Sequence, residues 1–145
     1  MKIGIVQINP TVGDLEGNVN RALEGIEQAA RQGADLIVLP EMVIPGCHPQ
    51  DILLDRYFLQ ATSAATADLA DEAKDFPPTI IGTVLPGKSG LLNAAVLLEG
   101  GKSRLLAAKR QLPNLDVAFE SRWFTPGPPT QVHQIAGKKM MVLVG

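Results

Sequence analysis

The feature that most restricts the fold of this chain is a short apolar run that ends abruptly at a proline and a glutamate. Leu36 to Leu39 has no polar residue, as in a strand covered on both faces, and it stops at Pro40-Glu41. An apolar, β-branched segment at Lys2 to Ile8 predicts an earlier strand. Between them, apolar residues at three- and four-residue spacing predict a helix with Asn18 as N-cap and Gly33 as its stop. Strand, helix, strand is the opening of a layered α/β fold.

The rest of the sequence predicts one more helix and a series of strands. Apolar spacing from Asp55 to Lys74 predicts a helix that ends before a Pro-Pro pair. Three apolar runs follow, at Thr79 to Leu85, Leu92 to Leu98 and Ser103 to Ala108, and the glycine-containing turns between them predict a meander. Met140 to Val144 predicts a further strand, inside which the sequence stops. We therefore expect an α/β domain that is truncated at its C-terminal end.

Composition narrows the classes of ligand and partner. The 145 residues are 46% hydrophobic and 19% charged, as in a soluble globular domain. A net charge of −2 provides no broad positive field for nucleic acid or an anionic membrane, so a small neutral or zwitterionic ligand fits better. The N-terminus does not read as a signal peptide, and no apolar stretch approaches about 18 residues. We expect a cytoplasmic protein.

Two charged residues stand at the ends of predicted strands. In layered α/β proteins functional side chains collect there, because loops project them into a shared crevice. Glu41 follows one strand, Lys109 follows another, and Gly145 stands at the end of a third. A carboxylate and an ammonium group brought together could activate a nucleophile and stabilise an oxyanion. From the residues alone, a turn-capping glutamate and a solvated lysine remain alternatives.

Five segments of the sequence carry a family resemblance. In order they are "GIVQINPTVGDLEGNVNRAL", "ADLIVLPEMVIPGCHPQDILL", "LLNAAVLLEGGK", "KRQLPNLDVAFESRWFTPG" and "KKMMVLVG". Their order and spacing resemble the nitrilase, or carbon-nitrogen hydrolase, superfamily, and within it most of all the N-terminal glutaminase domain of glutamine-dependent NAD synthetases. The resemblance runs from Lys2 to Gly145 and covers a little over half of a complete domain of this kind. It implies that residues 1–145 form part of a nitrilase-type α-β-β-α sandwich, a partial glutamine amidohydrolase domain.

The resemblance also implies roles for three residues. Glu41 is then the general base that takes a thiol proton, and Lys109 is the cation near the tetrahedral oxyanion. Glu120 matches a second glutamate that helps to hold the lysine and the substrate, although a structural ion pair with Arg122 or Lys109 remains an alternative. The thiolate attacks the side-chain amide carbon of glutamine, ammonia leaves, and water hydrolyses the thioester to glutamate. Leu115 departs from the family, which often has tyrosine there, so the usual substrate contacts of that loop are not carried over.

The nucleophile of the family is missing from this sequence. Its cysteine ends the strand that resembles "KKMMVLVG", and the alignment puts Gly145 at that position. Because glycine cannot form a thioester, we expect the chain by itself to be inactive. A true loss, an engineered change, a truncation or a one-residue shift of the alignment would each explain the glycine. Cys47, the only cysteine, lies on another loop and is expected to be a free thiol rather than the nucleophile.

Two other kinds of site have weaker support. Cys47 and His48 are adjacent, but His133 is the only other histidine and no ligand spacing repeats, so we expect no metal. Residues 82–89 match the phosphate-loop pattern G-x-x-x-x-G-K-[ST]. The segment is strand-like where a phosphate loop needs a flexible backbone and a following helix, which favours a hairpin over a nucleotide site.

The sequence therefore predicts a carbon-nitrogen hydrolase domain that acts on glutamine or another small amide and needs no cofactor in this domain. The resemblance implies that the ammonia passes to an NAD-forming synthetase domain. Since an incomplete sandwich leaves sheet and helix faces uncovered, we expect self-association or association with a synthetase domain, and neither nucleic acid nor membrane as partner. A stand-alone amidase of the same superfamily and a non-catalytic, degenerate amidase module remain alternatives.

Overall fold

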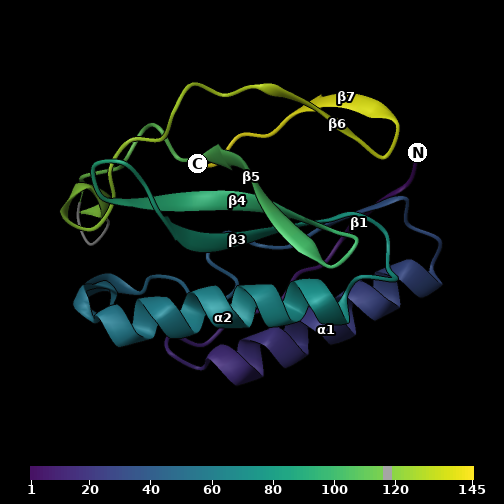
Figure 1. The fold of residues 1–145 in the computed structure, drawn as a ribbon, viewed down its shortest axis with the longest axis horizontal. Helices are drawn as coiled ribbons and strands as arrows, with labels where there is room; N and C mark the ends of the chain where they lie inside the picture. Colours follow the sequence, from purple (N-terminus) through teal and green to yellow (C-terminus); the bar gives the residue numbers. More distant parts are fainter. Residues whose placement is uncertain (116–118) are drawn as a thin grey trace.

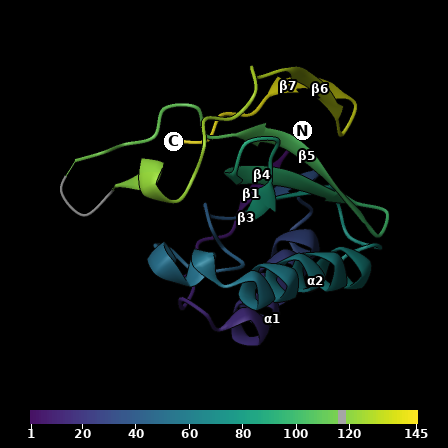
Figure 2. The ribbon, with the colours of Figure 1, turned by 60° about the vertical axis from the view of Figure 1, so that its left-hand side comes forward.

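The fold is a mixed sheet with two helices on one face and a β-hairpin on the other. The computed structural model describes residues 1–115 and 119–145. In chain order the elements are β1 (Ile3–Ile5), α1 (Leu15–Arg31), β2 (Leu36–Val38), the 3-10 helix η1 (Gln50–Leu54), α2 (Arg56–Glu72), β3 (Thr79–Pro86), β4 (Leu91–Glu99), β5 (Lys102–Ala108), the 3-10 helix η2 (Glu120–Arg122), β6 (Val132–Ile135) and β7 (Lys138–Met141). Helices α1 and α2 lie side by side under the sheet, and the β6–β7 hairpin lies above it (Figures 1 and 2). The predicted α/β class is confirmed.

The five strands of the main sheet lie in the order in which they occur in the chain. β1, β2 and β3 run parallel, because α1 and α2 cross one face of the sheet to connect them. β3, β4 and β5 are antiparallel neighbours joined by short turns, so the predicted meander is confirmed. The first strand is shorter than the predicted Lys2 to Ile8. Only Ile3–Ile5 pairs as a strand, and the Val6 N–H adds one hydrogen bond of 2.9 Å to the Val38 carbonyl.

Helix α1 begins earlier than the sequence pattern predicts. Its N-cap is Asp14, whose carboxylate accepts a hydrogen bond of 3.0 Å from the Gly17 N–H. The predicted cap, Asn18, lies inside the helix and is fully buried. Helix α2 agrees with its prediction and has Asp55 as N-cap. The shift in α1 matters because it places a buried amide where two loops meet.

Both faces of the central strands β2, β3 and β4 are largely buried, which explains why these strands are nearly continuous apolar runs. The core on the helix face includes Val19, Ala22, Ile26, Ile37, Leu69, Ile81 and Val96. The core on the opposite face includes Leu36, Ile80, Ala95, Leu97, Leu106 and Ile135, the last from the hairpin. Packing on both sides fixes the strands, and the strand ends therefore hold the adjoining loops at defined positions.

The C-terminal region differs from the prediction. A strand was expected at Met140 to Val144, whereas the structure has a strand at Lys138–Met141 paired with β6, which the sequence did not predict. Both residues of the connecting turn, Ala136 and Gly137, have positive φ (48° and 73°), as the tight turn of a two-residue hairpin requires. Residues 142–145 follow the hairpin outside any strand.

The phosphate-loop pattern at residues 82–89 forms the predicted hairpin. Gly82 to Pro86 belongs to β3, and β4 begins at Leu91, so an antiparallel strand stands where a phosphate loop would need a helix. Within residues 1–115 and 119–145, no helix combines the length and the apolar character needed to cross a membrane.

Candidate active site

Three charged side chains from distant parts of the sequence meet at one end of the sheet. The Lys109 ammonium group lies 2.8 Å from Glu120 Oε1 and 3.1 Å from Glu41 Oε1. Lys109 and Glu120 are each only 7% exposed, whereas the Glu41 side chain is 35% exposed. The structure therefore brings together the three residues that the sequence singled out, with the lysine buried between two carboxylates and one carboxylate open to small molecules.

Each of these residues follows an element that fixes its backbone. Glu41 comes shortly after β2, and Lys109 comes directly after β5. The Lys109 main chain is held on both sides, since its N–H donates to the Asn93 carbonyl at 2.8 Å and its carbonyl accepts from the Gly127 N–H at 2.9 Å. Glu120 begins η2, and its N–H donates to the Pro113 carbonyl at 3.0 Å.

One residue of the site was missed by sequence reasoning. Asn93 lies in β4, is 2% exposed, and donates from Nδ2 to Glu41 Oε1 at 2.5 Å. The available signal was its position: it is the one polar residue in the apolar run from Leu91 to Leu98. A buried amide in such a run requires a hydrogen-bond partner, and this partner is the carboxylate of the predicted base.

The loop that carries Glu41 packs directly on a glycine of the neighbouring strand. The Gly82 N–H donates to the Pro40 carbonyl at 3.1 Å. A Cβ atom at position 82 would lie 2.4 Å from the Met42 nitrogen and 2.6 Å from Glu41 Cα, closer than such atoms can approach. Met42 itself has a positive φ of 53°, which is rare for a residue with a side chain. The absence of a side chain at Gly82 thus allows the close approach that sets the position of Glu41.

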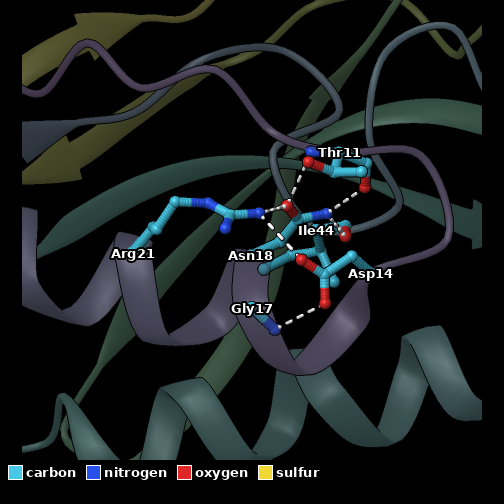
Figure 3. A network of polar contacts seen from close by, with 6 residues as sticks. All are labelled: Thr11, Asp14, Gly17, Asn18, Arg21 and Ile44. Carbon is cyan, nitrogen blue, oxygen red and sulfur yellow. Dashed lines mark hydrogen bonds and ion pairs between the residues drawn. The ribbon is translucent and has the colours of Figure 1, made fainter.

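A polar network around the buried Asn18 holds the same loop from the other side (Figure 3). The Asn18 amide donates to the carbonyls of Thr11, at 2.8 Å, and Ile44, at 2.9 Å, and accepts from the Thr11 N–H at 2.8 Å. Arg21 donates to Asn18 Oδ1 at 2.6 Å and to the Asp14 carboxylate at 3.1 Å. Asn18 therefore ties the loop after β1 to the loop after β2.

The electrostatic balance of the site keeps Lys109 charged. Burial by itself lowers the pKa of Lys109, but the hydrogen bonds and charges of Glu120 and Glu41 together outweigh burial, and the pKa lies above the ordinary lysine value. Lys109 is thus a fixed cation at neutral pH. A fixed cation at the wall of a pocket is suited to stabilising an oxyanion that forms beside it.

A small pocket opens beside the ion pairs. Its lining includes Glu41, Glu120, Asn93, Cys47 and the aromatic Trp123. Cys47 lies on the loop after β2, a different loop from residue 145, and this loop brings Cys47 to the pocket. Partial burial, followed by the negative charges of Glu41 and Glu120, raises the pKa of the Cys47 thiol, while Lys109 opposes them. The thiol is therefore protonated at neutral pH, which disfavours it as a nucleophile.

Gly145 is absent from the lining of the pocket that contains Glu41. It lines a second, open hollow together with Val144 and Lys109. A Cβ atom built on Gly145 would have none of the described atoms within 4 Å, so the space for a side chain is open. Lys109 thus lines the hollow that contains the predicted position of the nucleophile, and it pairs with Glu41 and Glu120, which line the pocket.

The residues considered for a metal site lie apart. Cys47 and His48 line the pocket, whereas the His133 ring belongs to β6 and makes a 2.7 Å hydrogen bond with the Leu106 carbonyl. Among the described residues, no group of three His, Cys, Asp or Glu side chains is placed to hold a metal ion.

Comparison with known proteins identifies the family. Residues 2–144 match the family model described as carbon-nitrogen hydrolase. The chain belongs to the carbon-nitrogen hydrolase family. Among curated relatives of the chain, the glutamine-dependent NAD(+) synthetase of Thermotoga maritima is 31% identical over 144 residues, which are 99% of this chain and 25% of the relative. The synthetase of the same description from Rhodobacter capsulatus is 39% identical over 127 residues, 88% of this chain and 23% of the relative. The chain spans about a quarter of the length of these relatives.

Solved structures agree with this assignment. The glutamine-dependent NAD+ synthetase of Acinetobacter baumannii superimposes on the carbon-nitrogen hydrolase chain with a TM-score of 0.81 at 29% identity, covering 97% of this chain and 27% of that protein. An amidase from Nesterenkonia sp. gives a TM-score of 0.76 at 19% identity and covers 99% of this chain and 54% of the amidase. At that identity the amidase shows the shared fold alone.

Two neighbouring aromatic residues, Trp123 and Phe124, also line the pocket. Phe124 is 6% exposed and packs with Met42, Leu53 and Val84, with Trp123 partly buried against the same cluster. Leu115 is 79% exposed. Glu120 pairs with Lys109, not with Arg122, whose guanidinium group lies 5.5 Å from the Trp123 ring centre.

Proposed function

We propose that this carbon-nitrogen hydrolase domain hydrolyses the side-chain amide of glutamine to glutamate and ammonia, and that the ammonia serves NAD synthesis by an adjoining synthetase domain. The observation that carries the proposal is the buried Lys109, within 3.1 Å of both Glu120 and Glu41 beside a pocket. The similarity to glutamine-dependent NAD(+) synthetases supports glutamine as the amide.

The surroundings of the three residues support the roles that we propose for them. Glu41 is the partly exposed carboxylate and acts as the general base that takes a thiol proton. Lys109 is the fixed cation that stabilises the negative charge on the amide oxygen when the tetrahedral intermediate forms. Glu120 is buried and holds the lysine, and it balances the lysine charge while Glu41 changes protonation.

The nucleophile belongs at position 145, where this chain has glycine. The chain by itself is therefore inactive, because its only thiol is Cys47 and that thiol is protonated at neutral pH. Gly145 is also the observation that favours the second candidate function, a non-catalytic amidase module that binds a small amide without cleaving it.

Cys47 provides a test of the substrate, since it is exposed and lines the pocket. We expect glutamine to slow alkylation of Cys47 in a saturable manner, and asparagine, shorter by one methylene, to do so only at higher concentration. Lys109→Met should weaken the protection, whereas Lys138→Met, which changes a lysine on the distant hairpin, is the matched control and should leave it intact. Equal protection by glutamine and by an unrelated amino acid would remove glutamine as the proposed ligand.

Ammonia release tests the assignment of the nucleophile. The chain should release no ammonia from glutamine above the rate without protein, and Cys47→Ser and Glu41→Gln should behave alike. Release that Glu41→Ala abolishes and Cys47→Ser leaves unchanged would show a nucleophile other than the one assigned.

Self-association is part of the proposal. β1 is an edge strand of the described sheet, and its Ile3 and Ile5 are 49% and 82% exposed. An apolar edge with unpaired backbone groups favours pairing with another chain. Sedimentation should therefore show a mass that rises with concentration, and a constant monomer mass would count against this part.

A further inference from the structure

A buried asparagine links the base and the lysine of the proposed site. Asn93 Nδ2 donates to Glu41 Oε1 at 2.5 Å, and Lys109 donates to the same oxygen at 3.1 Å. The main-chain carbonyl of Asn93 also accepts from the Lys109 N–H at 2.8 Å. One residue of β4 therefore contacts the first charged group through its side chain and the second through its backbone.

The two donors on one carboxylate oxygen fix how Glu41 is oriented. Oε1 is occupied by Asn93 and Lys109, while neither of them bonds to Oε2. Since Glu41 lines the pocket, this leaves Oε2 as the oxygen available to take a proton there. With Lys109 as the only donor, the carboxylate could rotate or move away while keeping an ion pair, because an ammonium group imposes little direction.

The surroundings of Asn93 favour a positioning role over a purely structural one. Its β4 neighbours from Leu91 to Leu98 are apolar, so an apolar residue would fit the strand without a polar group to satisfy. Asn93 Oδ1 is buried and has no hydrogen-bond partner among the described residues. The bond that Nδ2 makes to Glu41 is therefore the one side-chain hydrogen bond of Asn93 among the described residues.

We propose that Asn93 is the positioning residue for Glu41: it holds Oε1 beside Lys109 so that Oε2 faces the pocket. The importance of this orientation for catalysis rests on the proposed function, whereas the orientation of the Glu41 carboxylate by Asn93 does not. It can be tested through the titration of Lys109, which does not require glutamine to bind or react.

The test is a double-mutant cycle on the pKa of Lys109. This pKa is measured from the pH dependence of the ¹³C chemical shift of the Lys109 side chain, and the signal is assigned by its absence in Lys109→Arg. The groups that face Lys109 are Glu120, Glu41 and, at longer range, Cys47. All measurements therefore use the Cys47→Ser background, which removes the thiol titration. Asn93→Leu removes the donor with a side chain that suits the apolar strand, and Asn93→Ala is the second variant.

We expect Glu41→Gln to lower the Lys109 pKa by about 1 unit, and Asn93→Leu to lower it by a comparable part of that shift. The combined variant should show little more than Glu41→Gln alone, because Asn93 acts through Glu41. Thr83→Val is the matched control: it removes a buried hydroxyl from the adjacent strand and should leave the Lys109 pKa unchanged.

An unchanged Lys109 pKa in folded Asn93→Leu and Asn93→Ala would overturn the proposal, as would a shift that adds fully to that of Glu41→Gln. If the cycle is non-additive while glutamine fails to protect Cys47, the positioning role stands and the proposed substrate falls. The positioning role of Asn93 and the proposed function can therefore be rejected independently of each other.

Discussion

At the scale of single residues, Lys109 depends on its two carboxylate partners. A buried ammonium group is unfavourable unless paired, and here Glu120 and Glu41 supply opposite charge on two sides. Because Glu120 is as buried as the lysine, its bond of 2.8 Å is shielded from water more than the bond to Glu41. Glu120 is thus the main anchor, and Glu41 is the partner that remains accessible.

This arrangement predicts a loss of stability at alkaline pH. The pKa of Lys109 is raised in the folded state, so its contribution to the free energy of unfolding is complete below the ordinary lysine pKa and is lost as pH rises through the folded-state value. Urea unfolding at increasing alkaline pH should show this fall. In Lys109→Met the part of the fall due to this residue should disappear, and an identical pH dependence in the variant would contradict the assignment.

At the scale of elements, the position of Glu41 is set by parts of the chain that are far away in sequence. Gly82 in β3 lets the loop after β2 approach closely, and Asn18 in α1 ties that loop to the loop after β1. Asn93 in β4 then orients the carboxylate itself. The geometry of the candidate base therefore depends on a helix and two strands rather than on its own loop.

Asn18 should be the most sensitive of these supports. Asn18→Ala leaves the buried Ile44 carbonyl and the part-buried backbone groups of Thr11 without these partners, and we expect a loss of about 1–3 kcal/mol in the free energy of unfolding. Arg21→Ala, which removes a partly exposed partner of the same network, should cost less than about 1 kcal/mol. Chemical denaturation of both variants measures the two free energies of unfolding. Equal losses in the two variants would contradict the conclusion that Asn18 is the more important support.

The sequence predicted the elements better than the contacts between them. Periodic apolar spacing was enough for α2 and the meander, because burial of one face or two faces leaves a pattern in the sequence. The start of α1 was missed because asparagine is a common N-cap residue, whereas the Asn18 side chain here hydrogen-bonds to the loops after β1 and β2. The β6–β7 hairpin was missed because its strands are short and its turn contains Ala136, which rarely adopts positive φ.

In the candidate site, too, the sequence predicted residues at strand ends better than contacts between distant residues. Glu41 and Lys109 were found because strand ends and the family resemblance both mark them. The only sequence signal for Asn93 is that it is the one polar residue in an apolar run. Its hydrogen-bond partner, Glu41, lies 52 positions away in the sequence. The approach of Cys47 to the pocket depends on how the loop after β2 turns back, which no local pattern records.

At the scale of the whole molecule, Lys109 lines one opening and pairs with residues that line another. Glu41 and Glu120 line the pocket, and Gly145 lines the hollow together with Lys109. In a carbon-nitrogen hydrolase that uses a thiol at position 145, the base Glu41 and the nucleophile would share Lys109 as a neighbour. The central claim is therefore that position 145 is the place where a thiol becomes reactive.

The most direct test is the alkylation rate of the single thiol in Gly145→Cys/Cys47→Ser, compared with that of Cys47 in the unmodified chain. The side chain has space, and a small backbone rotation at this residue, which lies outside any strand, would relax its φ of 155°. The account predicts a rate at neutral pH at least about tenfold higher than that of Cys47, as for a thiol next to a cation, and a fall toward the Cys47 rate in Glu41→Gln. A thiol at position 145 that reacts no faster than Cys47 and does not respond to Glu41→Gln would contradict it.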